Sequence, residues 1–221
     1  MAVISRLTSV RLLVIRLSAM GDVAMVAPVL VALRRNYPNL RITVLTPKFL
    51  QPFFREVGNI EFFAPDLKGR HKGVAGLLRL GRDLGRFDLV ADLHDVLRSK
   101  GLCRLMKLRG TRIERIDKGR AEKKMLTAPE NKQRVQLKTT VEVFVRLGFD
   151  LPEIPLPSRI RYPMSEAVAR LAGAHDGTWI GVSPFAQHEG KIYPLDKMRE
   201  VMLRLARIPG ARIFVFGGGD A

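Results

Sequence analysis

The chain has 221 residues, enough for one large domain or two smaller ones, and 47% of them are hydrophobic, which excludes an intrinsically disordered chain. Its formal net charge of +17 at pH 7 predicts an anionic partner, which could be nucleic acid, an acidic membrane surface or a phosphorylated substrate. Residues 98–146 carry +10 of this charge, with 15 lysines and arginines against 5 acidic residues. The single cysteine, Cys103, excludes an intrachain disulfide and a cysteine-cluster metal site, and fits a reducing compartment.

Arginines interrupt the first twenty residues at Arg6, Arg11 and Arg16, so we expect no signal peptide. No run of the sequence approaches the roughly 18 apolar residues that a transmembrane helix needs. We therefore expect a cytoplasmic protein. Its basic surface allows peripheral contact with an anionic membrane, where each nearby lysine or arginine contributes about 1 kcal/mol.

The first predicted strand, residues 12–15, is a short apolar run of the kind that is buried on both faces of a parallel sheet. Its carboxyl end leads into Arg16-Leu17-Ser18-Ala19-Met20-Gly21-Asp22-Val23, the position at which open α/β sheets bind their ligands. This turn offers the hydroxyl of Ser18, a glycine, Gly21, that lets the backbone approach a ligand, and one carboxylate, Asp22. Spacing alone leaves two roles open for Asp22, a cap of the following helix or a catalytic base.

Strand-like and helix-like segments alternate along the rest of the first half, which predicts right-handed crossovers and a parallel sheet. Pro28 interrupts the apolar pattern of the first helix and predicts an irregular or kinked first turn. The predicted helices are 23–35, 49–57, 74–84, 96–106 and 132–147. The predicted strands after the first are 41–46, 60–63, 87–92 and 111–116.

A proline-rich segment, residues 150–163, separates two predicted domains, 1–149 and 164–221. Its four prolines fix φ and remove backbone donors, which is typical of a linker. The second domain is predicted to contain helices 165–172 and 195–206 and strands 179–183 and 212–216. One β-α-β unit buries too little surface for a complete domain, so we expect the second domain to be incomplete in this chain.

Three motifs, in this order, resemble glycosyltransferase family 9, the ADP-heptose–lipopolysaccharide heptosyltransferases. They are the turn at residues 16–23, then Asp92-Leu93-His94-Asp95-Val96-Leu97-Arg98-Ser99, and then Ser183-Pro184-Phe185-Ala186-Gln187-His188-Glu189-Gly190-Lys191-Ile192-Tyr193-Pro194. The resemblance implies an α/β protein with a GT-B-like fold. In that fold a Rossmann-like parallel-sheet domain binds mainly the acceptor, and a second Rossmann-like domain, which starts in this chain, binds mainly the nucleotide-sugar. Ala19, Ala186-Gln187 and Tyr193 depart from the family's pattern, which leaves the sugar more open than the reaction class.

The resemblance implies an inverting glycosyltransferase that moves heptose from ADP-heptose to the inner core of lipopolysaccharide. Asp22 matches the family's base, and Lys191 matches its phosphate-contacting lysine. The amino end of the helix at 195–206 would contact the same diphosphate. The other predicted donor-site residues are Ser18, Gly21, Gln187 and Asp220.

Other polar residues have weaker predicted roles. A flexible basic loop over residues 66–73, which also includes His71, supplies the predicted acceptor-binding residues, and a solvated charge run is the alternative. His94 and Asp92 each fit a structural role at least as well as a functional one. We expect no metal, because no carboxylate cluster has metal-ligand spacing, and the glycines at 217–219 do not form a dinucleotide fingerprint. The predicted acceptor-binding residues are Lys68, Arg70 and Lys72.

Two alternatives remain open at this point. One is a related glycosyltransferase with a different nucleotide-sugar or acceptor. The other is a basic nucleic-acid-binding protein, which is disfavoured because the chain lacks an RNA-binding aromatic signature and a recognisable helix-turn-helix. The expected partners are thus a nucleotide-sugar and a lipopolysaccharide core or lipid A precursor, with no cofactor and no nucleic acid. We expect the 221-residue chain alone to be inactive, because the family's nucleotide pocket also uses later strands.

Overall fold

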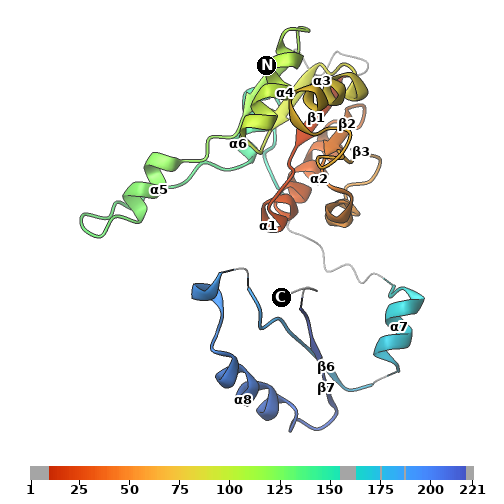
Figure 1. Cartoon of the computed structure of the whole chain (residues 1–221), viewed down its shortest axis with the longest axis vertical. Helices are drawn as coiled ribbons and strands as arrows, with labels where there is room; N and C mark the ends of the chain where they lie inside the picture. The colour runs from red at the N-terminus through yellow and green to blue at the C-terminus, as the bar shows by residue number, and fades with distance from the viewer. Residues whose placement is uncertain (1–9, 155–162, 175, 187, 218–221) are drawn as a thin grey trace. The chain divides into compact units, whose positions relative to one another are not determined.

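A computed structural model of the protein describes residues 10–154, 163–174, 176–186 and 188–217. The chain forms two compact units, residues 1–159 and residues 160–221, and each is described by itself (Figure 1). In these described segments no helix has the length and apolar character needed to cross a membrane.

The first unit is built on a five-stranded parallel sheet with the strand order β3-β2-β1-β4-β5. At its centre, β1 pairs with β2 and β4, so that Ile15 lies opposite Leu45 on one side and Asp92 on the other. The parallel sheet predicted from the alternating pattern is therefore confirmed. The strands are β1 (Arg11–Ile15), β2 (Arg41–Leu45), β3 (Glu61–Phe63), β4 (Leu89–Asp92) and β5 (Arg112–Arg115).

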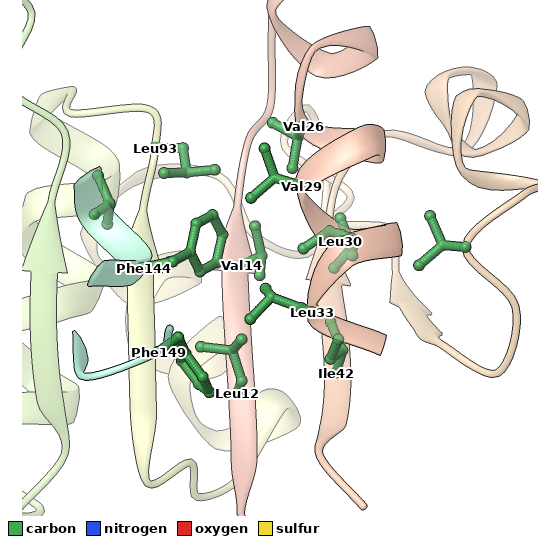
Figure 2. Packing of buried hydrophobic residues seen from close by; sticks show 14 of the residues in the cluster. Leu12, Val14, Val26, Val29, Leu30, Leu33, Ile42, Leu93, Phe144 and Phe149 are labelled. Carbon is green, nitrogen blue, oxygen red and sulfur yellow. The ribbon is translucent and has the colours of Figure 1, made fainter. Parts of the chain in front are cut away.

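Helices cover both faces of this sheet. Successive side chains of a strand point to opposite faces, so alternate residues of the central strand are buried in two different cores. Leu12 and Val14 lie in a large core that also holds buried residues of α2 and α6, among them Phe144 (Figure 2). Leu13 and Ile15 lie in a second core with buried residues of α3 and α4. The helical elements are α1 (Met20–Ala24), α2 (Val26–Asn36), the 3₁₀ helix η1 (Lys48–Phe54), α3 (Gly73–Leu84), α4 (Leu97–Lys107), α5 (Arg120–Leu126) and α6 (Val141–Leu147).

The helix predicted at 23–35 is divided into α1 and α2, with Met25 between them. Pro28 is the third residue of α2 and has no N–H to donate to the carbonyl of Ala24, so one continuous helix would lose that hydrogen bond. In the first turn of a new helix the missing donor costs nothing, since those N–H groups have no helical partner. The irregularity predicted at Pro28 is confirmed as a break between two helices.

The helix predicted at 132–147 is wrong over its first half, because only α6 is helical and residues 127–140 are not. Most helical stability in proteins comes from packing an apolar face. Phe144 and Leu147 are fully buried in the large core, whereas Val135 is 37% exposed and has no core to join. The short helix α5, which the sequence did not predict, has no buried residue and therefore shows no apolar stripe.

The large core of the first unit extends past residue 149. Leu151, within the segment predicted to be a linker, is buried in this core, and Ile154 packs against it. The ring of Phe149 packs edge-on against Tyr37, with 5.1 Å between ring centroids. The hydroxyl of Tyr37 also accepts a hydrogen bond from the N–H of Asp150 at 2.7 Å. Through these contacts the end of the first unit packs against Tyr37, the residue that follows α2.

The second unit contains one β-α-β arrangement in its described part. Strands β6 and β7 pair in parallel over their full length, from Thr178 opposite Ala211 to Val182 opposite Val215. A helix precedes them, capped by the hydroxyl of Ser165. The elements are α7 (Glu166–Ala172), β6 (Thr178–Val182), the 3₁₀ turn η2 (Glu189–Lys191), α8 (Leu195–Leu205) and β7 (Ala211–Val215).

Candidate active site

Asp22 lies just beyond the carboxyl end of the central strand, as the third residue of α1. Its Oδ2 forms an ion pair with Nη2 of Arg16 and accepts a hydrogen bond from the N–H of Ala19 at 3.4 Å. Within the described segments, no hydrogen bond or ion pair reaches its other oxygen, Oδ1. The side chain is 55% exposed. Asp22 therefore caps its helix weakly through one oxygen and leaves the second for a ligand.

Arg16 fixes the position of this carboxylate. Its side chain is only 11% exposed, and Nη1 donates to the carbonyl oxygen of Leu93, in the loop after β4. A buried guanidinium is costly to desolvate unless it is paired and hydrogen-bonded. These two contacts engage both Nη atoms, while the buried Nε has no hydrogen-bond partner among the described residues. The turn after β1 is thus tied to the loop after β4, which joins the first two sequence motifs.

Asp92 organises the loop of the second motif and has the structural role that its sequence context allows. Its fully buried carboxylate accepts hydrogen bonds from the N–H groups of His94 at 3.1 Å and Asp95 at 3.0 Å. Its other oxygen pairs with Nε of Arg115 at 3.1 Å. Burial, together with the charge of Asp92, raises the pKa of the Cys103 thiol to about 12, so this cysteine stays protonated at neutral pH.

His94 lies where these two loops meet. Burial lowers the pKa of its imidazole, and the positive charges of Arg16 and Lys118 lower it further. A hydrogen bond with the backbone of Ser18 and the charge of Asp92 act in the opposite direction without cancelling the effect. The imidazole is therefore neutral at physiological pH and contacts the turn that carries Asp22.

A cavity of about 640 Å³ lies beside Asp22, within the usual size range of small-molecule sites. Arg16 and Asp22 form its charged wall, and apolar side chains from α2, from the loop after β4 and from the start of α6 form most of the remainder. Two lysines, Lys123 and Lys138, also line it. The cavity thus combines an apolar surface, one available carboxylate oxygen and cationic groups.

Lys123 and Lys138 were not among the residues singled out from the sequence. They lie far from Asp22 in the chain, one in α5 and the other in a segment without regular secondary structure, so no periodic pattern indicates them. The available signal was the excess of lysine and arginine over residues 98–146. Nζ of Lys138 pairs with Oδ2 of Asp117 at 2.6 Å, which holds this lysine close to the end of β5.

The basic loop over residues 66–73, predicted to be flexible, is held by two carboxylates. Asp66 accepts hydrogen bonds from the N–H groups of Gly69 at 2.9 Å and Arg70 at 2.8 Å. Asp83 pairs with Arg70 through both of its oxygens and accepts from Nε2 of the buried His71 at 3.0 Å. These contacts, that with Arg70 first, hold the pKa of Asp83 well below its usual range. None of the three predicted acceptor-binding residues of this loop lines the cavity beside Asp22.

Other predicted donor-site residues lie in both units. Ser18 and Gly21 are in the exposed turn with Asp22, and a Cβ built on Gly21 meets no atom within 4 Å, so the space beside it is open. In the second unit, Lys191 is exposed at the end of η2, and its N–H donates to the carbonyl of His188 at 2.9 Å. It precedes α8 by a few residues. Gln187 and Asp220 lie outside the described residues.

No group of three or more histidine, cysteine, aspartate or glutamate side chains that could hold a metal ion occurs in the part of the chain that the structure describes.

The chain has a GT-B-like fold, as comparison with solved structures shows. It superimposes on a glycosyl transferase of family 9 from Veillonella parvula with a TM-score of 0.71 and 23% identity, covering 97% of this chain and 64% of that one. It also matches E. coli ADP-heptose LPS heptosyltransferase II, with a TM-score of 0.60, 21% identity and coverage of 95% and 65%. A third similar structure is E. coli heptosyltransferase WaaC with ADP, with a TM-score of 0.59, 18% identity and coverage of 95% and 67%.

The predicted fold class is therefore confirmed, and the chain spans about 64% of the length of the Veillonella parvula protein. No protein-family model and no curated protein matches the sequence.

Proposed function

We propose that the protein is an inverting glycosyltransferase that moves heptose from ADP-heptose to the inner core of lipopolysaccharide. The observation that carries the proposal is the carboxylate of Asp22, fixed by Arg16 at the carboxyl edge of the sheet and facing a cavity of about 640 Å³. The fold supports it, because two of the similar structures are heptosyltransferases, one of them described with ADP.

In the proposed reaction, an acceptor hydroxyl attacks the anomeric carbon of the donor while the bond from that carbon to the diphosphate oxygen breaks. The hydroxyl proton passes to Oδ1 of Asp22, and ADP leaves with the electron pair of the broken bond. Because Arg16 and the N–H of Ala19 engage Oδ2, the remaining oxygen is held in one orientation. Attack from the face opposite the leaving group inverts the anomeric configuration.

The departing diphosphate gains negative charge, and we assign its stabilisation to Lys191 and the amino end of α8. A cation and a helix amino terminus both favour an anion, and a contact that strengthens as charge develops accelerates the reaction. Under this proposal the reaction needs no metal or other cofactor. Ser18 and Gly21 contribute hydrogen bonding and backbone space to the sugar or its phosphates.

We assign the acceptor to the cavity beside Asp22. Its apolar surface suits the faces of a saccharide, and Lys123 and Lys138 suit the acidic groups of a lipopolysaccharide core or lipid A precursor. Lys68, Arg70 and Lys72 remain the predicted contacts to more distant parts of such an acceptor. The net charge of +17 supports peripheral attachment to the anionic cytoplasmic face of the membrane that carries it.

The test is the substitution Asp22→Asn in the full-length protein. The amide can still accept the hydrogen bond from Ala19 but cannot take the proton, so we expect turnover to fall by roughly 10²–10⁴-fold while calorimetric affinity for ADP is retained. Asp150→Asn, the same change at an exposed position away from the cavity, should leave turnover unchanged. Unchanged turnover of Asp22→Asn at saturating substrates would mean that Asp22 is only a helix cap.

A panel of nucleotide-sugars in the same transfer assay separates this proposal from a related transferase. Preference for ADP-heptose supports the assignment. A clear preference for another donor would leave the proposed role of Asp22 unchanged and would show that ADP-heptose is not the substrate.

A further inference from the structure

A second cavity, of about 650 Å³, lies at the edge of the sheet that β5 forms, between residues of α4 and α6. Among the described residues, it shares none of its lining with the cavity beside Asp22. One described carboxylate, Glu114, lines it, against several cationic side chains from three different elements. These cations are Arg104 and Lys107 of α4, Arg112 and Arg115 of β5, and Arg146 of α6.

Three of the arginines are held in place by other parts of the first unit. Nε of Arg115 lies 3.1 Å from Oδ2 of Asp92. Arg146 pairs through Nε with Glu114 at 3.1 Å and donates from Nη2 to the carbonyl of Arg115 at 2.6 Å. Arg112 in turn donates to the carbonyl of Arg146. These side chains are therefore positioned before any ligand arrives, which reduces the entropy lost on binding.

Arg104 and Lys107 differ from these three, because no ion pair or side-chain hydrogen bond engages them in the described residues. Both are exposed, and they are three residues apart on α4, where side chains of like charge are neighbours and repel each other. The one carboxylate of the cavity is already paired with Arg146. The lining therefore holds an excess of positive charge that an anion would relieve.

We propose that this cavity binds the phosphate group of a phosphorylated ligand. Guanidinium groups match phosphate oxygens with paired hydrogen bonds, and a mixed set of arginine and lysine cations suits an anion with several oxygens. A cavity of this volume admits a small phosphorylated molecule or the headgroup of a phospholipid. None of the described residues assigned to the donor site lines this cavity.

The test measures calorimetric binding of inorganic pyrophosphate at constant ionic strength. Every arm carries Lys191→Ala, so that the proposed donor site does not contribute. We expect the protein with an intact cavity to bind one pyrophosphate and the further change Arg104→Ala/Lys107→Ala to weaken that affinity about tenfold or more. Both residues are exposed, and circular dichroism checks that the variant remains folded. The matched control, Arg35→Ala/Lys48→Ala, removes the same charge from exposed residues of this unit and should retain the affinity.

A second arm, flotation with phosphatidylcholine vesicles with and without phosphatidic acid, distinguishes a headgroup from a free ligand. Loss of pyrophosphate binding in the cavity variant alone supports the proposal with a free phosphorylated ligand. Additional loss of binding to the acidic vesicles, again in that variant alone, supports it with a phospholipid as the source. Equal pyrophosphate affinity and equal flotation in the cavity variant and the control would overturn the proposal.

Discussion

At the scale of single residues, the contacts of Asp22 are compatible with both roles that its sequence position left open. One of its oxygens accepts from the N–H of Ala19 and pairs with Arg16, which is what a helix cap would do. The other oxygen remains for a ligand, which is what a base requires. The sequence did not indicate a role for Arg16, because one of its partners, the carbonyl of Leu93, becomes a neighbour only when β1 and β4 pair.

Lys191 should affect both binding and rate. In the full-length protein, we expect Lys191→Ala to weaken ADP-heptose affinity and lower turnover, because a cation at the diphosphate is needed more as the leaving group gains charge. Lys191→Arg should restore only part of the rate, since a planar guanidinium replaces a compact ammonium. Donor titration and initial rates measure these effects, with Arg204→Ala, at an exposed cation in the last turn of α8, as the control. Wild-type affinity and rate in Lys191→Ala would refute the assignment.

The lowered pKa of His94 makes stability depend on pH in a defined direction. As pH falls below the ordinary histidine value of about 6.5, the unfolded chain binds a proton that folded His94 does not, so the folded state is destabilised. We therefore expect wild type to lose more unfolding free energy than His94→Gln between pH 7.5 and roughly pH 5. Urea unfolding of both proteins at each pH gives this difference, in which the shared carboxylates cancel. Parallel pH profiles would contradict the shift.

At the scale of elements, the parts best predicted from sequence are those whose side chains are buried on both faces of the sheet. β1 and β4 were predicted from apolar runs, and their buried residues explain why. The helix α5 was not predicted, and the segment before α6 was wrongly predicted to be helical. Both bury few side chains, so their hydrophobic pattern does not report on packing. The cavity lysines, Lys123 and Lys138, lie in this same region, which is why the acceptor wall was predicted less well than the turn at Asp22.

Two glycines of α3 make a sharp test of how this helix packs. A Cβ built on Gly76 would lie 2.3 Å from the backbone carbonyl carbon of His71, whereas one built on Gly81 would lie 3.7 Å from the nearest atoms, methyl groups of Leu102 and Leu105. We expect Gly76→Ala to destabilise the protein by about 1–3 kcal/mol, because a backbone atom cannot move aside cheaply. Gly81→Ala should be neutral or stabilising by up to about 1 kcal/mol through helix propensity. Thermal and urea unfolding compare them, and equal effects would contradict the contact between α3 and the preceding loop.

At the scale of the whole molecule, the sequence predicted the class of fold better than the composition of the site. Alternating strands and helices determine a parallel sheet with two covered faces, and the carboxyl edge of such a sheet is where its ligands bind. The position of Asp22 at that edge follows from this rule, whereas its predicted role as a base came from the resemblance to glycosyltransferases. The cations of the two cavities come from segments that only the folded sheet brings together. The count of charged residues along 98–146 therefore predicted that cations are abundant there, but not which of them line a cavity.

The central claim is glycosyl transfer, and its most direct measurement is transfer of heptose from ADP-heptose to a heptose-deficient lipopolysaccharide by the full-length protein. We expect one ADP released for each sugar transferred, a product whose anomeric configuration is inverted relative to the donor, and loss of both with Asp22→Asn. Mass spectrometry and nuclear magnetic resonance of the product provide these readouts. Failure to transfer sugar from any nucleotide-sugar, together with salt-dependent binding to nucleic acid, would contradict the account.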